Sequence, residues 1–131
     1  MYERMFLLAT PKEAPMLTLE QALAALPLGG NDEVPVFLQS DAELTIAYGD
    51  FHFRIGYQSG DLAAQESLEI AAAYATAHPA RDKIRQTYAR YELTSDFDPD
   101  MDHFNDLLFI TEKIESLGEV YTFDPQEEAF Q

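Results

Sequence analysis

Alternation of apolar and polar residues along residues 34–58 constrains the fold of this chain more than any other feature of its sequence. Three runs alternate in this way: Val34, Val36 and Leu38; Leu44, Ile46 and Tyr48; and Phe51, Phe53, Ile55 and Tyr57. A period of two puts every second side chain on the same face of a β-strand. Gly49-Asp50 separates the last two runs, and a two-residue loop with glycine first suits a tight hairpin. We therefore expect a three-stranded antiparallel meander.

Further strand and helix signals lie on both sides of this meander. Residues 5–9 form a continuous apolar run, which predicts a strand buried on both faces. Thr18 and Gln21 have the spacing of a capping box, so a helix is expected from Thr18 to about Pro27. Beyond the meander, the alanine-rich residues 62–77 predict a second helix that packs closely on the sheet.

The last third of the chain should contain a strand, a helix and a final strand. Residues 86–94 favour a strand, although a short helix just before it is an alternative. Asp98 is the expected N-cap of the following helix, Pro99 its first residue and Gly118 the residue after its end. The apolar residues between them recur at helical spacing: Phe104, Leu107, Ile110, Ile114 and Leu117. Residues 120–123 predict the final strand.

These elements follow one another in the order β-α-β-β-β-α-β-α-β. This order predicts an α+β fold, in which helices pack on a face of one mainly antiparallel sheet. A chain of 131 residues corresponds to one domain. We therefore expect a single domain over residues 1–131, ending in a short acidic tail at about residues 124–131.

The chain is strongly acidic, with a formal net charge of −16. From Glu92 to the C-terminus it has twelve carboxylate side chains and one basic residue, Lys113. Nucleic acids and anionic membranes bind basic surfaces, so neither is an expected partner, whereas a basic protein is. The sequence contains no cysteine, which excludes thiolate catalysis and cysteine-bound zinc. No leader-like or membrane-spanning run is present, and we expect a cytoplasmic protein.

Five aspartates around the start of the last expected helix form what we call the aspartate cluster: Asp96, Asp98, Asp100, Asp102 and Asp106. Their spacing resembles the beginning of an EF-hand loop. The required glycine is replaced by Met101 or His103, however, and the required glutamate by Leu107 or Phe109, depending on the register. The cluster is therefore not an EF-hand.

Helix electrostatics accounts for only part of the aspartate cluster. Asp98 and Asp100 would be stabilised at the positive end of a helix dipole. Asp102 and Asp106 are four residues apart, and on a helix they would repel each other. A looser cation site that uses Asp96, Asp98, Asp100 and the pair of Asp102 and Asp106 is an open alternative. Separately, His103 and Asp106 could share a metal ion, or Asp106 could orient the imidazole for acid–base work.

Motifs that identify an enzyme are missing from the sequence. It has no serine-hydrolase elbow, no zinc-protease motif and no phosphate-binding loop. The aromatic residues of 49–55 partly match an RNA-recognition strand, but they lack its basic flanks and fit a core strand better. We expect no cofactor and favour a protein without catalytic activity.

The sequence thus favours a small binding protein that covers a positively charged surface, such as an immunity or inhibitor protein that neutralises a toxin or a nuclease. The alternative is a small metal-binding or hydrolytic domain centred on residues 96–106. Residues expected to contact the partner are Asp96, Phe97, Asp98, Asp100, Asp102, Asp106, Glu112 and Glu115. Among them Phe97 is the expected apolar anchor, because charges steer association better than they hold a complex.

Overall fold

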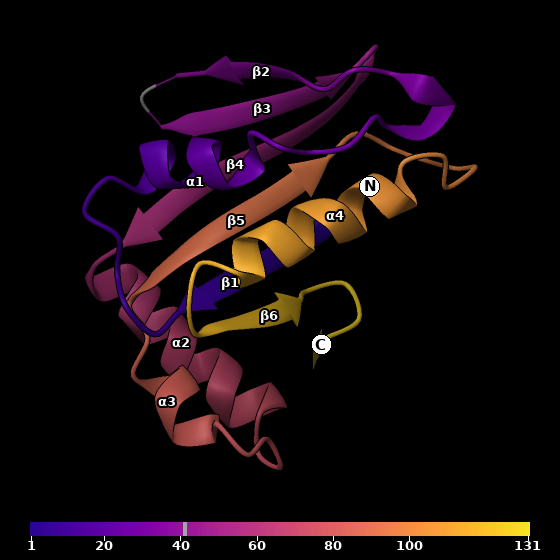
Figure 1. Ribbon diagram of the computed structural model, residues 1–131. Helices are drawn as coiled ribbons and strands as arrows, with labels where there is room; N and C mark the ends of the chain where they lie inside the picture. The colour runs from indigo at the N-terminus through magenta and orange to yellow at the C-terminus, as the bar shows by residue number, and fades with distance from the viewer. Residues whose placement is uncertain (41) are drawn as a thin grey trace.

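One antiparallel sheet runs through the computed structural model, which describes residues 1–40 and 42–131 (Figure 1). Its strands are β1 (Glu3–Leu8), β2 (Val36–Gln39), β3 (Glu43–Tyr48), β4 (Phe51–Ser59), β5 (Ala89–Ser95), β6 (Val120–Asp124) and β7 (Ala129–Phe130). They lie in the order β2-β3-β4-β5-β1-β6-β7, and each neighbouring pair is antiparallel. The apolar strand β1 is therefore inside the sheet, between β5 and β6, as its sequence predicts.

Helices lie on both faces of this sheet. They are α1 (Pro15–Leu23), α2 (Asp61–Tyr74), α3 (Arg81–Arg85) and α4 (Phe104–Glu115), with a short 3-10 turn, η1, at Gly30–Asp32. Helices α1 and α4 lie side by side over one face (Figure 1). Helices α2 and α3 pack on the other face through a smaller cluster of Leu7, Ala71, Ala75 and Ile84. The expected α+β class is confirmed, with helices packed against a seven-stranded antiparallel sheet in the described part of the chain.

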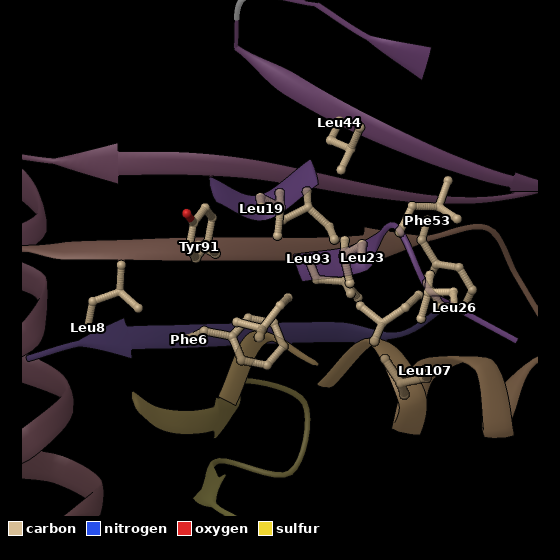
Figure 2. Close-up of a cluster of buried hydrophobic side chains, with 14 of the residues drawn as sticks. Phe6, Leu8, Leu19, Leu23, Leu26, Leu44, Phe53, Tyr91, Leu93 and Leu107 are labelled. Carbon is tan, nitrogen blue, oxygen red and sulfur yellow. The ribbon is translucent and has the colours of Figure 1, made fainter. Parts of the chain in front are cut away.

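The main hydrophobic core lies between the sheet and the pair α1 and α4 (Figure 2). Phe6 of β1, Leu93 of the neighbouring strand β5 and Leu107 of α4 are each at most 1% exposed. Burying such side chains removes apolar surface from water, at about 25 cal/mol for each Å². The one polar atom of Tyr91 is satisfied there, since its hydroxyl donates a hydrogen bond to the carbonyl of Pro15 at 2.6 Å.

The three strands of the meander form as expected, but in the first strand Phe37, and not the expected Val36 and Leu38, faces the core. In β2, Val36 and Leu38 are more than half exposed, and Phe37 packs against the main core. Pairing sets this orientation, because Val36 is opposite Ala47 and Phe37 is opposite Ile46. A residue shares its face with its cross-strand partner, and Ile46 faces the core.

Several element boundaries differ from those expected. Helix α1 begins at Pro15, not at Thr18, and the ambiguous residues before β5 contain the short helix α3. Residues 124–131, expected as a tail, contain β7, which pairs with β6. None of the described helices is long and apolar enough to cross a membrane.

The start of the last helix is the largest of these differences. Helix α4 begins at Phe104, five residues after Pro99, and the residue before it is His103, so the predicted N-cap at Asp98 is wrong. Met101 has a φ of 59°, which lies in the left-handed region and interrupts a right-handed helix. Residues 96–103 therefore form a loop between β5 and α4.

The adjacent residues Leu107 and Leu108 test the packing of α4. Leu107 is fully buried and Leu108 is 44% exposed. We expect Leu107→Ala to lower the free energy of unfolding by about 2–5 kcal/mol, because it leaves a cavity under the helix. Leu108→Ala, the matched control, should change it by no more than about 0.5 kcal/mol. Urea unfolding of both variants measures this, and equal losses would contradict the packing of α4.

Candidate functional site

The loop of residues 96–103 projects from one end of the sheet, between β5 and α4 (Figure 1). Asp96 holds its first end against β4. The Asp96 carboxylate accepts hydrogen bonds from the backbone N–H of His52 at 2.9 Å and from Arg54 Nη2 at 2.9 Å, and it lies 3.1 Å from His52 Nδ1. Asp96 is thus engaged within the protein. Partial burial opposes its ionisation, but the hydrogen bonds from Arg54 and His52 outweigh this and hold its pKa below the ordinary value.

Asp98 organises the middle of the loop. Its carboxylate accepts three hydrogen bonds: from the hydroxyl of Tyr2 at 2.7 Å, from the N–H of Asp102 at 3.1 Å and from the N–H of His103 at 2.9 Å. The carboxylate therefore caps the turn before α4. Burial and this bond to a negative carboxylate raise the pKa of Tyr2 above its ordinary value, so Tyr2 stays a hydrogen-bond donor.

A buried pair, His103 and Asp106, anchors the second end of the loop. His103 Nδ1 lies 2.9 Å from Asp106 Oδ2, and the ring of Phe51 stacks on the imidazole with 4.2 Å between centroids. The N–H of Gly30 also donates to Asp106 Oδ2, at 3.3 Å. A Cβ on Gly30 would lie 2.3 Å from the carbonyl oxygen of Asp102, so only glycine permits this close approach.

Burial removes Asp106 from the surface on which the sequence led us to expect it. It is 2% exposed, and it follows from helical spacing that Asp106 lies near the inward stripe of Leu107 and Ile110. Asp96 and Asp98 were also expected to contact a partner, but both are partly buried and accept hydrogen bonds from other parts of the protein. The aspartate cluster is therefore split between internal hydrogen-bond acceptors and exposed charges.

The exposed part of the loop combines apolar side chains with carboxylates. Phe97 is 76% exposed and Met101 is 57% exposed, and Asp100 and Asp102 are exposed beside them. Left-handed backbone at a methionine costs conformational free energy, so Met101 keeps this conformation only because its surroundings hold it. The hydrogen bonds of Asp98 to the residues that follow supply that restraint.

The outer side of α4 continues this surface along the chain. Leu108, Phe109, Glu112 and Glu115 are exposed on it. Glu115 also accepts a hydrogen bond from the hydroxyl of Thr122 at 2.7 Å. We call the exposed acidic and large apolar residues of the loop and of α4 the acidic face: Phe97, Asp100, Met101, Asp102, Leu108, Phe109, Glu112 and Glu115.

No lysine or arginine of the described residues forms an ion pair with a carboxylate of the acidic face. The described ion pairs of lysine and arginine are Arg4 with Asp124, Arg54 with Asp96, Lys83 with Glu119, and Arg90 with Glu66 and Glu92. Within the described residues, Asp100, Asp102, Glu112 and Glu115 form no such pair. Their charges therefore produce a negative potential at this surface.

The alternative hypothesis of a metal site lacks a suitable set of ligands in residues 1–40 and 42–131. No group of three histidine, aspartate or glutamate side chains there is arranged to hold a metal ion. The carboxylates of Asp96, Asp98 and Asp106 are used within the protein: Asp96 contacts Arg54, Asp98 accepts from the backbone N–H of His103, and Asp106 lies beside the His103 imidazole.

Three apolar residues of the acidic face, Met101, Leu108 and Phe109, were not expected from the sequence as site residues. A signal for the last two was present, because Leu108 and Phe109 lie outside the helical stripe of residues 104, 107, 110, 114 and 117. An apolar residue outside the buried stripe of an amphipathic helix faces solvent unless a partner covers it.

Comparison with protein-family models, curated proteins and solved structures finds no match to this chain. Its function must therefore be inferred from the geometry, exposure and charge of the acidic face. The acidic face presents four exposed carboxylates and four exposed apolar side chains on a short segment that is anchored at both ends of its loop.

The role of Asp98 in fixing the loop can be measured by unfolding. Asp98→Ala removes the acceptor of three hydrogen bonds, so we expect the free energy of unfolding to fall by about 1–3 kcal/mol. Asp100→Ala removes the same charge from an exposed position and should change it by less than about 0.5 kcal/mol. An Asp98→Ala variant as stable as Asp100→Ala would show that Asp98 does not hold the loop.

Asp96 should make stability depend on pH. Because the pKa of Asp96 is lowered in the folded protein, its contribution is present above its ordinary pKa of 3.8 and is lost as pH falls through the folded-state value. Asp96→Asn should therefore be less stable than the native sequence at neutral pH, and the difference should shrink as the pH falls below 3.8. Urea unfolding at several pH values tests this. A difference that stays constant over the whole range would rule out an ionised Asp96 as its cause.

Proposed function

We propose that this protein binds a positively charged protein partner through the acidic face. The observation that carries the proposal is that exposed apolar side chains, Phe97 above all, lie among carboxylates that no described lysine or arginine neutralises. Carboxylates attract a basic surface over a long range and accelerate association. Buried aromatic anchors then slow dissociation, since most binding free energy comes from a few such residues.

Preorganisation of the loop supports this function. Asp98, His103 and Asp106 are used to fix the backbone on either side of Met101, so little conformational entropy would be lost when a partner binds. Inhibitors and immunity proteins fit this description. Nucleases and many toxins hold phosphate groups with lysine and arginine, and an acidic surface with apolar anchors complements such a site.

The partner can be sought with a matched pair of baits. The native protein and the double variant Asp100→Lys/Asp102→Lys are immobilised at low salt, and proteins retained by the native bait but not by the double variant are identified. Glu13→Lys/Glu43→Lys carries the same change in charge at exposed positions outside the acidic face and serves as the control. A basic protein retained by the native and control baits, and not by the loop variant, is the expected partner.

Rates of association then test how that partner is bound. We expect the association rate constant to fall at least about tenfold between about 50 mM and 500 mM salt, because the Debye length drops roughly threefold. Phe97→Ala and Phe109→Ala should mainly raise the dissociation rate constant, since they remove anchors and leave the charge unchanged. Stopped-flow fluorescence measures both rates.

Two results would contradict this proposal. The first is an association rate that is the same at low and high salt. The second is an equal loss of binding in Asp100→Lys/Asp102→Lys and in Glu13→Lys/Glu43→Lys, because overall charge, and not the acidic face, would then explain the interaction.

A further inference from the structure

A groove lies on the face of the sheet opposite α4, where α2 approaches β1 and β6. Its volume is about 530 Å³. Met5 of β1 and Phe123 of β6 line it from the sheet, and Leu62, Ile70 and Tyr74 line it from α2. Pro125 and Glu128, in the turn between β6 and β7, also line it. We call this the α2 groove.

Apolar side chains in the α2 groove are only partly covered by the fold. Leu62, in the first turn of α2, is 72% exposed. Tyr74 at the other end of the helix is exposed too, although its ring stacks on Phe123 with 5.3 Å between centroids. A single exposed leucine is ordinary, but apolar side chains gathered along a concave surface mark a binding site.

The charged side chains that line the α2 groove within the described residues are all glutamates. Glu66, Glu69 and Glu128 line it, and its described lining includes no lysine or arginine. Glu66 is paired with Arg90 at 2.7 Å, and Arg90 is buried and shared with Glu92. Glu69 and Glu128 form no ion pair within the described residues, so they remain available to a cation from outside the protein.

The combination of an apolar lining with unpaired glutamates favours one kind of ligand. Apolar lining requires an apolar side chain, and the glutamates require positive charge on either side of it. Anionic ligands would be repelled by the glutamates and by the net charge of −16. A polypeptide segment can supply an apolar anchor and flanking cations together, and its backbone can follow an open groove.

We propose that the α2 groove binds a cationic polypeptide segment in which a large apolar side chain is flanked by lysine or arginine. This site is separate from the acidic face, because α2 and α4 lie on opposite faces of the sheet. It does not depend on the function proposed above: either surface can bind its ligand if the other does not.

A pair of synthetic peptides tests the proposal. The first alternates lysine with leucine, and the second has glutamate at each lysine position. We expect the lysine peptide to bind the full chain at low salt and to shift the NMR signals of Met5, Leu62 and Ile70. The glutamate peptide should not bind, because the groove repels it.

Variants of the groove and of its surroundings separate the possible outcomes. Leu62→Ser and Glu69→Lys/Glu128→Lys should each weaken binding of the lysine peptide about tenfold, measured by fluorescence anisotropy. Leu68→Ser removes another exposed leucine of α2 that does not line the groove, and it should change the affinity less than about twofold.

Glu13→Lys/Glu43→Lys makes the same change in charge at exposed positions outside both the α2 groove and the acidic face, and it should leave binding to the groove nearly unchanged. The proposal is overturned if the lysine peptide does not bind, if the glutamate peptide binds equally well, or if Leu62→Ser and Leu68→Ser have the same effect. NMR shifts confined to Leu108 and Phe109 would also overturn it, while supporting the acidic face as the binding surface.

Discussion

Packing of α4 against the sheet supports both the core and the surface of this protein. The inward stripe of α4 places Leu107, Ile110 and Ile114 in the main core, where all three are fully buried. The same packing fixes which residues of α4 face solvent, because side chains on a helix keep a constant angular spacing. Leu108, Phe109 and the glutamates beyond them are therefore held on a rigid element, which keeps the proposed binding surface in one geometry.

The aspartates near α4 differ in their burial and in their hydrogen-bond partners, which explains how so many can lie close together. Asp96 and Asp98 meet hydrogen-bond donors from β4, from Tyr2 and from the loop backbone, so their charges are stabilised locally. Asp106 is buried and hydrogen-bonded, as a buried carboxylate must be. Only Asp100 and Asp102 of the aspartate cluster are exposed and unpaired within the described residues. Repulsion between neighbouring carboxylates is thus smaller than the sequence suggests.

Both proposed surfaces use apolar side chains bordered by carboxylates, but they differ in shape. The acidic face consists of a loop that projects from one end of the sheet and the outer side of a helix packed on the sheet, and this convex shape suits a concave basic site on a partner. The α2 groove is concave and suits an extended segment. A strong negative charge on the whole chain favours cationic ligands at both surfaces.

Local periodicity and composition determined much of this protein from the sequence alone: the meander, the buried stripe of α4, the α+β class and the negative charge. These features depend on residues close together in the chain, so a single sequence reveals them. Only the tertiary structure decided the start of α4 and the use of each aspartate. The partners of Asp98 and Asp106 include Tyr2 and Gly30, which are 96 and 76 residues away in the chain. Contacts of that range arise when the strands pair and the helices pack, and no local pattern records them.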